Sequence, residues 1–185
     1  CGNILNLTRA IKFLGYEIEI THDYKKIIQS SHVILPGVGA FGNAMKQIEK
    51  YSLRKTILEY AKLDKPLLGI CLGMQILLKQ GHEFGVHEGI GLIEGKVIKI
   101  SNKKNHKIII PHVGWNEIYP SQDKKEFKSK IIENSLLGKS FYFVHSFVCL
   151  TKDPSSTIAI CDYSGISIPA VVATKNIFGC QFHPE

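Results

Sequence analysis

Hydrophobic residues in the first half of the chain switch between helical spacing and short continuous runs. Apolar side chains recur every three or four positions from Ile4 to Leu14, which predicts an amphipathic helix ending at Gly15. The same criteria predict strands at 18–21, 33–36 and 66–70, and helices over 52–63 and from 71 to about 81. Strands and helices that alternate in this order predict a parallel sheet with helices on both faces.

The second half of the chain is dominated by strand-like segments. They lie at 97–100, 108–110, 117–119, 141–150, 157–161, 170–173 and 177–182. The predicted fold is therefore α/β and flavodoxin-like, a parallel sheet flanked by helices with an antiparallel β extension. No repeat or linker divides residues 1–185, so we expect a single domain. A helix opening at Asn3 calls for a preceding strand, so we also expect a longer parent protein that holds a first strand and a C-terminal tail.

Composition favours a globular domain over several other classes of protein. The chain is 44% hydrophobic with a mean hydropathy of +0.03, and no apolar run is long enough to span a membrane. The net charge of +7 invites a nucleic-acid partner, but only two of the 23 basic residues are arginine, so we expect none. The lysines gather in two loop-like patches, at 103–107 and 124–130, which we interpret as a solvated surface.

Cysteine usage indicates a reducing compartment. The five cysteines have no paired short spacing, so no disulfide framework is predicted and the cytoplasm is the expected location. No C-x-x-C or H-x-x-x-H spacing suggests a metal site, and we expect no metal and no cofactor. Cys149, Cys161 and Cys180 fall in strand patterns and are predicted to be core residues.

The strongest candidate for chemistry is Cys71, in the sequence Gly-Ile-Cys-Leu-Gly at 69–73. A nucleophile between two glycines, where a strand turns into a helix, has the form of a nucleophile elbow. The glycines relieve the crowding of the turn, and the start of the helix favours the reactive thiolate. This pattern predicts a nucleophilic Cys71 rather than an inert buried thiol.

A cysteine nucleophile needs a base, and His183 is the best placed of the eight histidines. It follows the apolar strand at 177–182, and Pro184 keeps it extended. Glu185 then lies on the same side as His183 and can orient the imidazole. The three residues form a candidate Cys-His-Glu triad.

The glycine-rich segment at 37–42 allows two interpretations. Gly-x-Gly-x-x-Gly after a strand matches a dinucleotide-binding loop, but the acid that should follow the next strand to bind a ribose is missing. Such glycines can instead direct backbone N–H groups toward an oxyanion, together with the N–H of Leu72. A non-catalytic, flavodoxin-like nucleotide-binding module remains the remote alternative.

The segments at 69–75 and 181–185 resemble the class I, or triad, glutamine amidotransferases. Pro-His-Val-Gly-Trp-Asn at 111–116, Tyr-Phe-Val-His-Ser-Phe at 142–147 and the segment at 89–97 are similar to the glutaminase subunits of imidazole glycerol phosphate synthase. The resemblance covers the whole chain. It implies hydrolysis of L-glutamine through a thioester on Cys71, with His183 as base and acid and Glu185 as its orienting partner.

The resemblance also implies roles for further residues. Those expected to bind glutamine are Gly39, Gln75, Glu83, Ser146 and Phe147, with Glu83 meeting the substrate ammonium. Amides of Val38, Gly39 and Leu72 would form the oxyanion hole, completed by an amide flip in the loop that couples glutamine hydrolysis to the partner's occupancy.

The implied partner is a (β/α)8-barrel cyclase subunit in a heterodimer. It would receive ammonia through a channel for histidine biosynthesis. The residues expected at the interface are Asn3, His112, Trp115 and Asn116, with core packing as the alternative for Trp115. The alternative acceptor of ammonia is a surface-polysaccharide sugar, served by a paralogous amidotransferase with nearly the same motifs.

Overall fold

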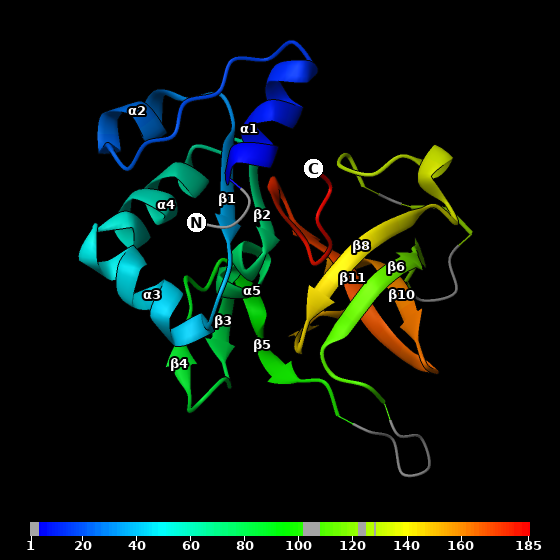
Figure 1. Cartoon of the computed structure of the whole chain (residues 1–185). Helices are drawn as coiled ribbons and strands as arrows, with labels where there is room; N and C mark the ends of the chain where they lie inside the picture. The colour runs from blue at the N-terminus through cyan, green and yellow to red at the C-terminus, as the bar shows by residue number, and fades with distance from the viewer. Residues whose placement is uncertain (1–3, 102–107, 122–124, 128) are drawn as a thin grey trace.

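The computed structural model describes residues 4–101, 108–121, 125–127 and 129–185. Its central sheet has six strands in the order β1-β2-β12-β11-β10-β7 (Figure 1). Their bounds are β1 Val33–Gly37, β2 Leu67–Cys71, β12 Ile177–Cys180, β11 Ile166–Thr174, β10 Thr157–Tyr163 and β7 Tyr119–Pro120. β1, β2 and β12 run parallel, and β11, β10 and β7 continue the sheet in antiparallel pairing. This confirms the predicted α/β architecture with its antiparallel extension.

Helices cover both faces of the parallel strands. The helices are α1 Ile4–Phe13, α2 Tyr24–Gln29, α3 Phe41–Lys50, α4 Leu53–Lys62 and α5 Leu72–Leu77. Apolar side chains of α2 to α5 form one buried cluster, whereas Leu7 of α1 belongs to a second cluster with strands of the extension. Figure 1 shows α2, α3 and α4 together on one side of β1 and β2. The core is thus divided between the two faces of the sheet.

Two smaller sheets complete the molecule. One has the order β4-β3-β5-β9, and the other is the antiparallel pair β6-β8. Their bounds are β3 Leu78–Gly81, β4 His87–Glu88, β5 Ile93–Lys99, β9 Phe147–Thr151, β6 His112–Glu117 and β8 Ser140–His145; short 3-10 helices lie at Asn134–Leu136 and Pro154–Ser156. The bridge between Tyr142 of β8 and His183 joins the β6-β8 pair to the end of the chain.

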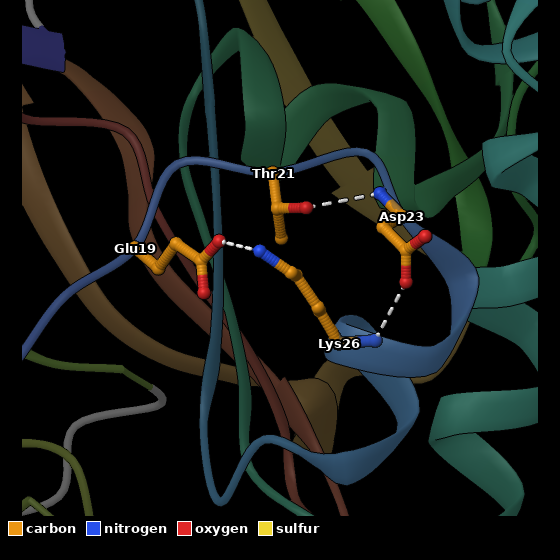
Figure 2. Close-up of polar contacts among 4 residues, drawn as sticks. All are labelled: Glu19, Thr21, Asp23 and Lys26. Carbon is orange, nitrogen blue, oxygen red and sulfur yellow. Dashed lines mark hydrogen bonds and ion pairs between the residues drawn. The ribbon is translucent and has the colours of Figure 1, made fainter.

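The strand predicted at 18–21 is wrong. These residues are irregular and half-buried or exposed, and none of them pairs with a strand within the described part of the chain. The Thr21 hydroxyl accepts a hydrogen bond from the Asp23 amide, and the Asp23 carboxylate caps α2 by accepting from the Lys26 amide at 3.0 Å. Lys26 also forms an ion pair with Glu19 (Figure 2). A short apolar run does not form a strand without a ladder partner.

Further differences have similar causes. The helix predicted to end near residue 81 stops at Leu77, because Leu78–Gly81 pairs in parallel with β5. The segment at 108–110 is irregular, and the strand predicted over 141–150 divides at Ser146 into β8 and β9. Cys149, Cys161 and Cys180 are buried, as predicted. The lysines at 103, 104, 107, 124 and 128 lie outside the described residues.

Candidate active site

The backbone at Cys71 makes a strained turn at the end of β2. Its φ of 54° and ψ of −112° lie in a region that L residues other than glycine rarely adopt. Glycine is required on both sides. A Cβ on Gly73 would lie 1.7 Å from the Leu35 carbonyl oxygen, and one on Gly69 would lie 2.6 Å from the Gly73 carbonyl group. The strand, the turn and the helix therefore pack closely enough to hold the thiol in one place.

A pocket of about 350 Å³ opens in front of Cys71. The predicted oxyanion-hole residues Val38, Gly39 and Leu72 line it, and so does His183. The residues expected to bind glutamine also line the pocket: Gly39, Gln75, Glu83, Ser146 and Phe147. Gly39 has a φ of +95° with open space around a Cβ, so its backbone conformation rather than crowding requires glycine there. Segments far apart in the sequence thus converge on the sulfur.

His183 and Glu185 lie together behind the thiol. The imidazole Nδ1 is 3.0 Å from a carboxylate oxygen of Glu185, and both side chains are largely buried. The pKa of His183 is raised to about 9, chiefly by a hydrogen bond with Cys71. Burial lowers this pKa, and the hydrogen bond with Glu185 raises it further. The His183 amide donates to the Tyr142 carbonyl at 3.0 Å, which anchors the backbone. Next to the Cys71 sulfur, the imidazole of His183 therefore favours its protonated form.

Two polar side chains reach the pocket from the helical side. The Glu83 carboxylate accepts a hydrogen bond from the Phe41 amide at 2.6 Å, which ties it to the first residue of α3. The Gln75 Nε2 donates to the Phe147 carbonyl at 3.3 Å and to the Gln181 Oε1 at 3.1 Å. Both side chains are therefore held in place before a ligand arrives.

Gln181 and His145 are site residues that the sequence analysis missed. The Gln181 side chain is fully buried, with its Nε2 3.7 Å from the Cys71 sulfur. His145 lines the pocket, and its Nδ1 lies 2.8 Å from the Phe147 carbonyl oxygen. Gln181 could have been found from the parallel pairing of β2 with β12, because Ile70 pairs with Cys180 and the next residues are Cys71 and Gln181.

His112, which the resemblance places at the partner interface, is fully buried in the chain alone. Its ring nitrogens lie 2.9 Å from the His145 Nε2 and 2.8 Å from the Asn116 Oδ1, so both are engaged within the chain. The Asn116 amide in turn donates to the Asp162 carbonyl. Burial lowers the pKa of His112 and lowers that of His145 to about 4.

The chain of contacts through these residues has acceptors at both ends, the carbonyls of Phe147 and Asp162. Its four contacts need four protons. Two neutral imidazoles and one amide, His145, His112 and Asn116, supply three between them. With both rings neutral, one contact in the chain therefore lacks a proton.

Comparison with known proteins decides the family. The family model described as glutamine amidotransferase class-I matches residues 1–185. The chain belongs to the class-I glutamine amidotransferases. A relative from Legionella pneumophila (strain Lens), imidazole glycerol phosphate synthase subunit HisH 1, is 39% identical over 188 residues, covering all of this chain and 87% of the relative. A second relative, imidazole glycerol phosphate synthase subunit HisH of Bacillus cereus (strain ATCC 14579), is 42% identical, and the alignment covers all of this chain and 83% of the relative.

Solved structures support the same fold for this amidotransferase. A structure described as a glutamine amidotransferase aligns with a TM-score of 0.67 at 17% sequence identity. The alignment covers 99% of this chain and 86% of the chain in that structure. The structure of PurLQS from Thermotoga maritima matches 99% of the chain and 82% of its own with a TM-score of 0.64 at 19% identity. At this level of identity the likeness concerns the fold alone.

One exposed apolar surface of the amidotransferase lies on the β6-β8 pair. Trp115 is 71% exposed, and Val113 and Val144 are exposed beside it on the same two strands. Core packing of Trp115, the alternative considered from sequence, is wrong. Asn3 lies outside the described residues. We call Val113, Trp115 and Val144 the β6-β8 patch.

The described part of the amidotransferase gives two further findings. No three His, Cys, Asp or Glu side chains within it are grouped so that they could hold a metal ion. None of its helices has the length and apolar character needed to cross a membrane.

Proposed function

We propose that this amidotransferase hydrolyses L-glutamine to glutamate and ammonia, as the glutaminase subunit of imidazole glycerol phosphate synthase in histidine biosynthesis. The observation that carries the proposal is the strained Cys71 turn, which opens into a pocket beside the His183 and Glu185 pair. The names and identity of the HisH relatives support the choice of pathway.

The reaction divides amide cleavage into two easier steps. The Cys71 thiolate attacks the side-chain carbonyl carbon of glutamine, and the His183 imidazolium gives its proton to the departing ammonia. A water molecule, deprotonated by His183, then attacks the thioester and releases glutamate and the thiolate. Glu185 holds the imidazole through its Nδ1 in both steps. Glutamine and water are consumed, and glutamate and ammonia are formed.

Pocket residues bind the substrate and the oxyanion. The second oxygen of Glu83 binds the α-ammonium, because the first is held by the Phe41 amide. The Oε1 of Gln75 accepts from the substrate, since the Gln75 Nε2 already donates twice. Ser146 and Phe147 form the opposite wall of the pocket. Backbone amides at Val38, Gly39 and Leu72 stabilise the oxyanion.

The ammonia is used by a partner, a (β/α)8-barrel cyclase that forms a heterodimer with this chain. The β6-β8 patch is the docking surface, because exposed aromatic side chains beside apolar ones are typical of interface centres. Trp115 contacts the partner directly, whereas His112 acts from beneath through Asn116. A free thiol nucleophile suits the reducing conditions of the cytoplasm, which we propose as the compartment.

Two measurements test this proposal. The protein is incubated with an electrophilic glutamine analogue, and the modified residue is mapped. We expect label on Cys71 alone, lost in Cys71→Ala and retained in the matched control Cys149→Ala, since Cys149 is fully buried. Label on another cysteine, or none, would overturn the triad.

Glutamate release is then measured for the subunit alone and with the barrel partner and its ribulosyl formimino precursor. We expect strong stimulation by the precursor-loaded partner. Glutamine hydrolysis that does not respond to this precursor would retain the triad but redirect the ammonia to another acceptor, such as a surface sugar.

A further inference from the structure

The sulfur of Cys71 has a neighbour that the proposed mechanism does not use. Gln181 follows β12 directly, and its amide donates to the Ala170 carbonyl at 2.9 Å, which fixes its backbone beside the end of β2. Its side chain is fully buried and is absent from the pocket lining. The Nε2 lies 3.7 Å from the sulfur, within hydrogen-bonding distance for a sulfur acceptor.

The orientation of the Gln181 amide follows from the groups around it. The Phe147 carbonyl can only accept, so Gln75 must direct its NH₂ group toward it. The same NH₂ group faces Gln181, which must therefore present its oxygen to Gln75. Turning the Gln181 amide over would bring two NH₂ groups together and place an oxygen against the sulfur. The network thus directs the Gln181 NH₂ group toward the sulfur.

We propose that Gln181 is a sulfur-binding residue whose N–H donates to the Cys71 thiolate and holds it ready to react. The inference rests on the proposed glutaminase function for its kinetic consequence. A donor on the thiolate favours it over the neutral thiol, which accepts hydrogen bonds weakly. The same bond stabilises the thiolate as it leaves the thioester in the second step. Gln75 has a double role, since it lines the pocket and orients Gln181.

Alkylation of the thiol tests the proposal without glutamine. The full-length protein is treated with iodoacetamide over a pH series, and modification of Cys71 is followed by mass spectrometry. In Gln181→Met, which keeps the length of the side chain and removes the donor, we expect the profile to move to higher pH. A tenfold lower thiolate fraction, the effect of a change of about 1.4 kcal/mol, gives about tenfold slower alkylation near neutral pH. Gln47→Met, at an exposed position on α3, is the matched control and leaves the profile unchanged.

A second variant guards against a general loss of structure. Gln181→Glu keeps an oxygen for Gln75 but places the other carboxylate oxygen against the sulfur, so it moves the profile in the same direction and further. For glutamine hydrolysis, both variants lower kcat with little change in KM, because Gln181 lies outside the pocket lining.

Three outcomes separate this inference from the proposed function. Wild-type alkylation profiles in folded Gln181→Met and Gln181→Glu overturn the inference even if the parent hydrolyses glutamine. A shifted profile in a parent without glutaminase activity supports the sulfur contact and refutes the function. A rise in KM alone assigns Gln181 to substrate binding and also overturns the inference.

Discussion

The strain at Cys71 can be measured by comparing two variants that both lack the thiol. Cys71→Ala keeps a Cβ in the unfavourable backbone conformation, with φ 54° and ψ −112°, whereas Cys71→Gly removes it. An ordinary replacement of alanine by glycine in a strand is destabilising. At position 71 we expect the glycine variant to unfold at the same or a higher denaturant concentration than the alanine variant, because glycine adopts positive φ without steric cost.

The size of the effect follows from three contributions. Glycine loses about 0.5–1 kcal/mol of conformational entropy relative to alanine, and the lost methyl group costs about 0.8 kcal/mol when buried. Strain of this kind at a residue other than glycine is on the order of 1–3 kcal/mol. The first two contributions apply at any buried strand position, and Cys71 is 8% exposed. The third applies at position 71 and not in a regular strand, so release of about 2 kcal/mol offsets the other losses.

The matched control is Ala170→Gly in β11, a buried position in a regular strand. We expect about 1–2 kcal/mol of destabilisation there, against a change near zero between Cys71→Ala and Cys71→Gly. Urea unfolding of all four proteins gives both differences from the midpoints and slopes. Thermal midpoints should separate the two effects by about 2–8 °C, since 1 kcal/mol moves the midpoint by about 2–4 °C in a domain of this size. Equal losses at positions 71 and 170 would refute the argument for strain.

Three more predictions follow from the geometry. Cys71→Ala removes the largest cause of the raised pKa of His183, so an NMR titration of the ring should show the pKa falling from about 9 toward 6.5. The contribution of His183 to stability is complete below pH 6.5 and is lost as the pH rises through about 9. Gly73→Ala places a Cβ 1.7 Å from the backbone of β1 and should lower the free energy of unfolding by about 3 kcal/mol or prevent folding. In the control Gly91→Ala, the new Cβ meets no atom within 4 Å, so only the positive φ should matter, at about 1 kcal/mol. Urea unfolding of the two variants measures the difference. Trp115 is 71% exposed, so Trp115→Ala should change the free energy of unfolding by less than about 0.5 kcal/mol. The same variant should bind the barrel partner at least tenfold more weakly in calorimetry. Unchanged affinity would exclude the β6-β8 patch as the docking surface.

Local sequence was sufficient to predict the turn at Cys71 and the pairing of His183 with Glu185. The elbow needs only a strand, a turn and glycines at fixed offsets, and the structure shows why each glycine is required. His183 and Glu185 are two residues apart, so an extended backbone places their side chains on the same side, and here they meet at 3.0 Å. Short-range geometry of this kind can be predicted from a single sequence.

Pairing between distant segments could not be predicted. The helix predicted beyond Leu77 gives way to a strand because β5, more than a dozen residues later, offers a ladder. The segment at 18–21 finds no neighbouring strand among the described residues and stays irregular. Composition and spacing do not determine which strand a segment pairs with. The wrong helix beyond Leu77 and the wrong strand at 18–21 therefore have the same origin.

The polar groups around the nucleophile show this limit most clearly. Gln181 reaches the sulfur across 110 positions of sequence, and the Phe147 carbonyl accepts from both Gln75 and His145. That carbonyl therefore joins two sets of contacts, one ending at the thiol and the other passing through buried His112 to the strand that carries the exposed Trp115. The second set is one proton short when both imidazoles are neutral, so one of its four contacts is weaker than the others. Every contact in the first set has a donor, so the two amides hold the orientation that directs the Gln181 NH₂ group toward the sulfur.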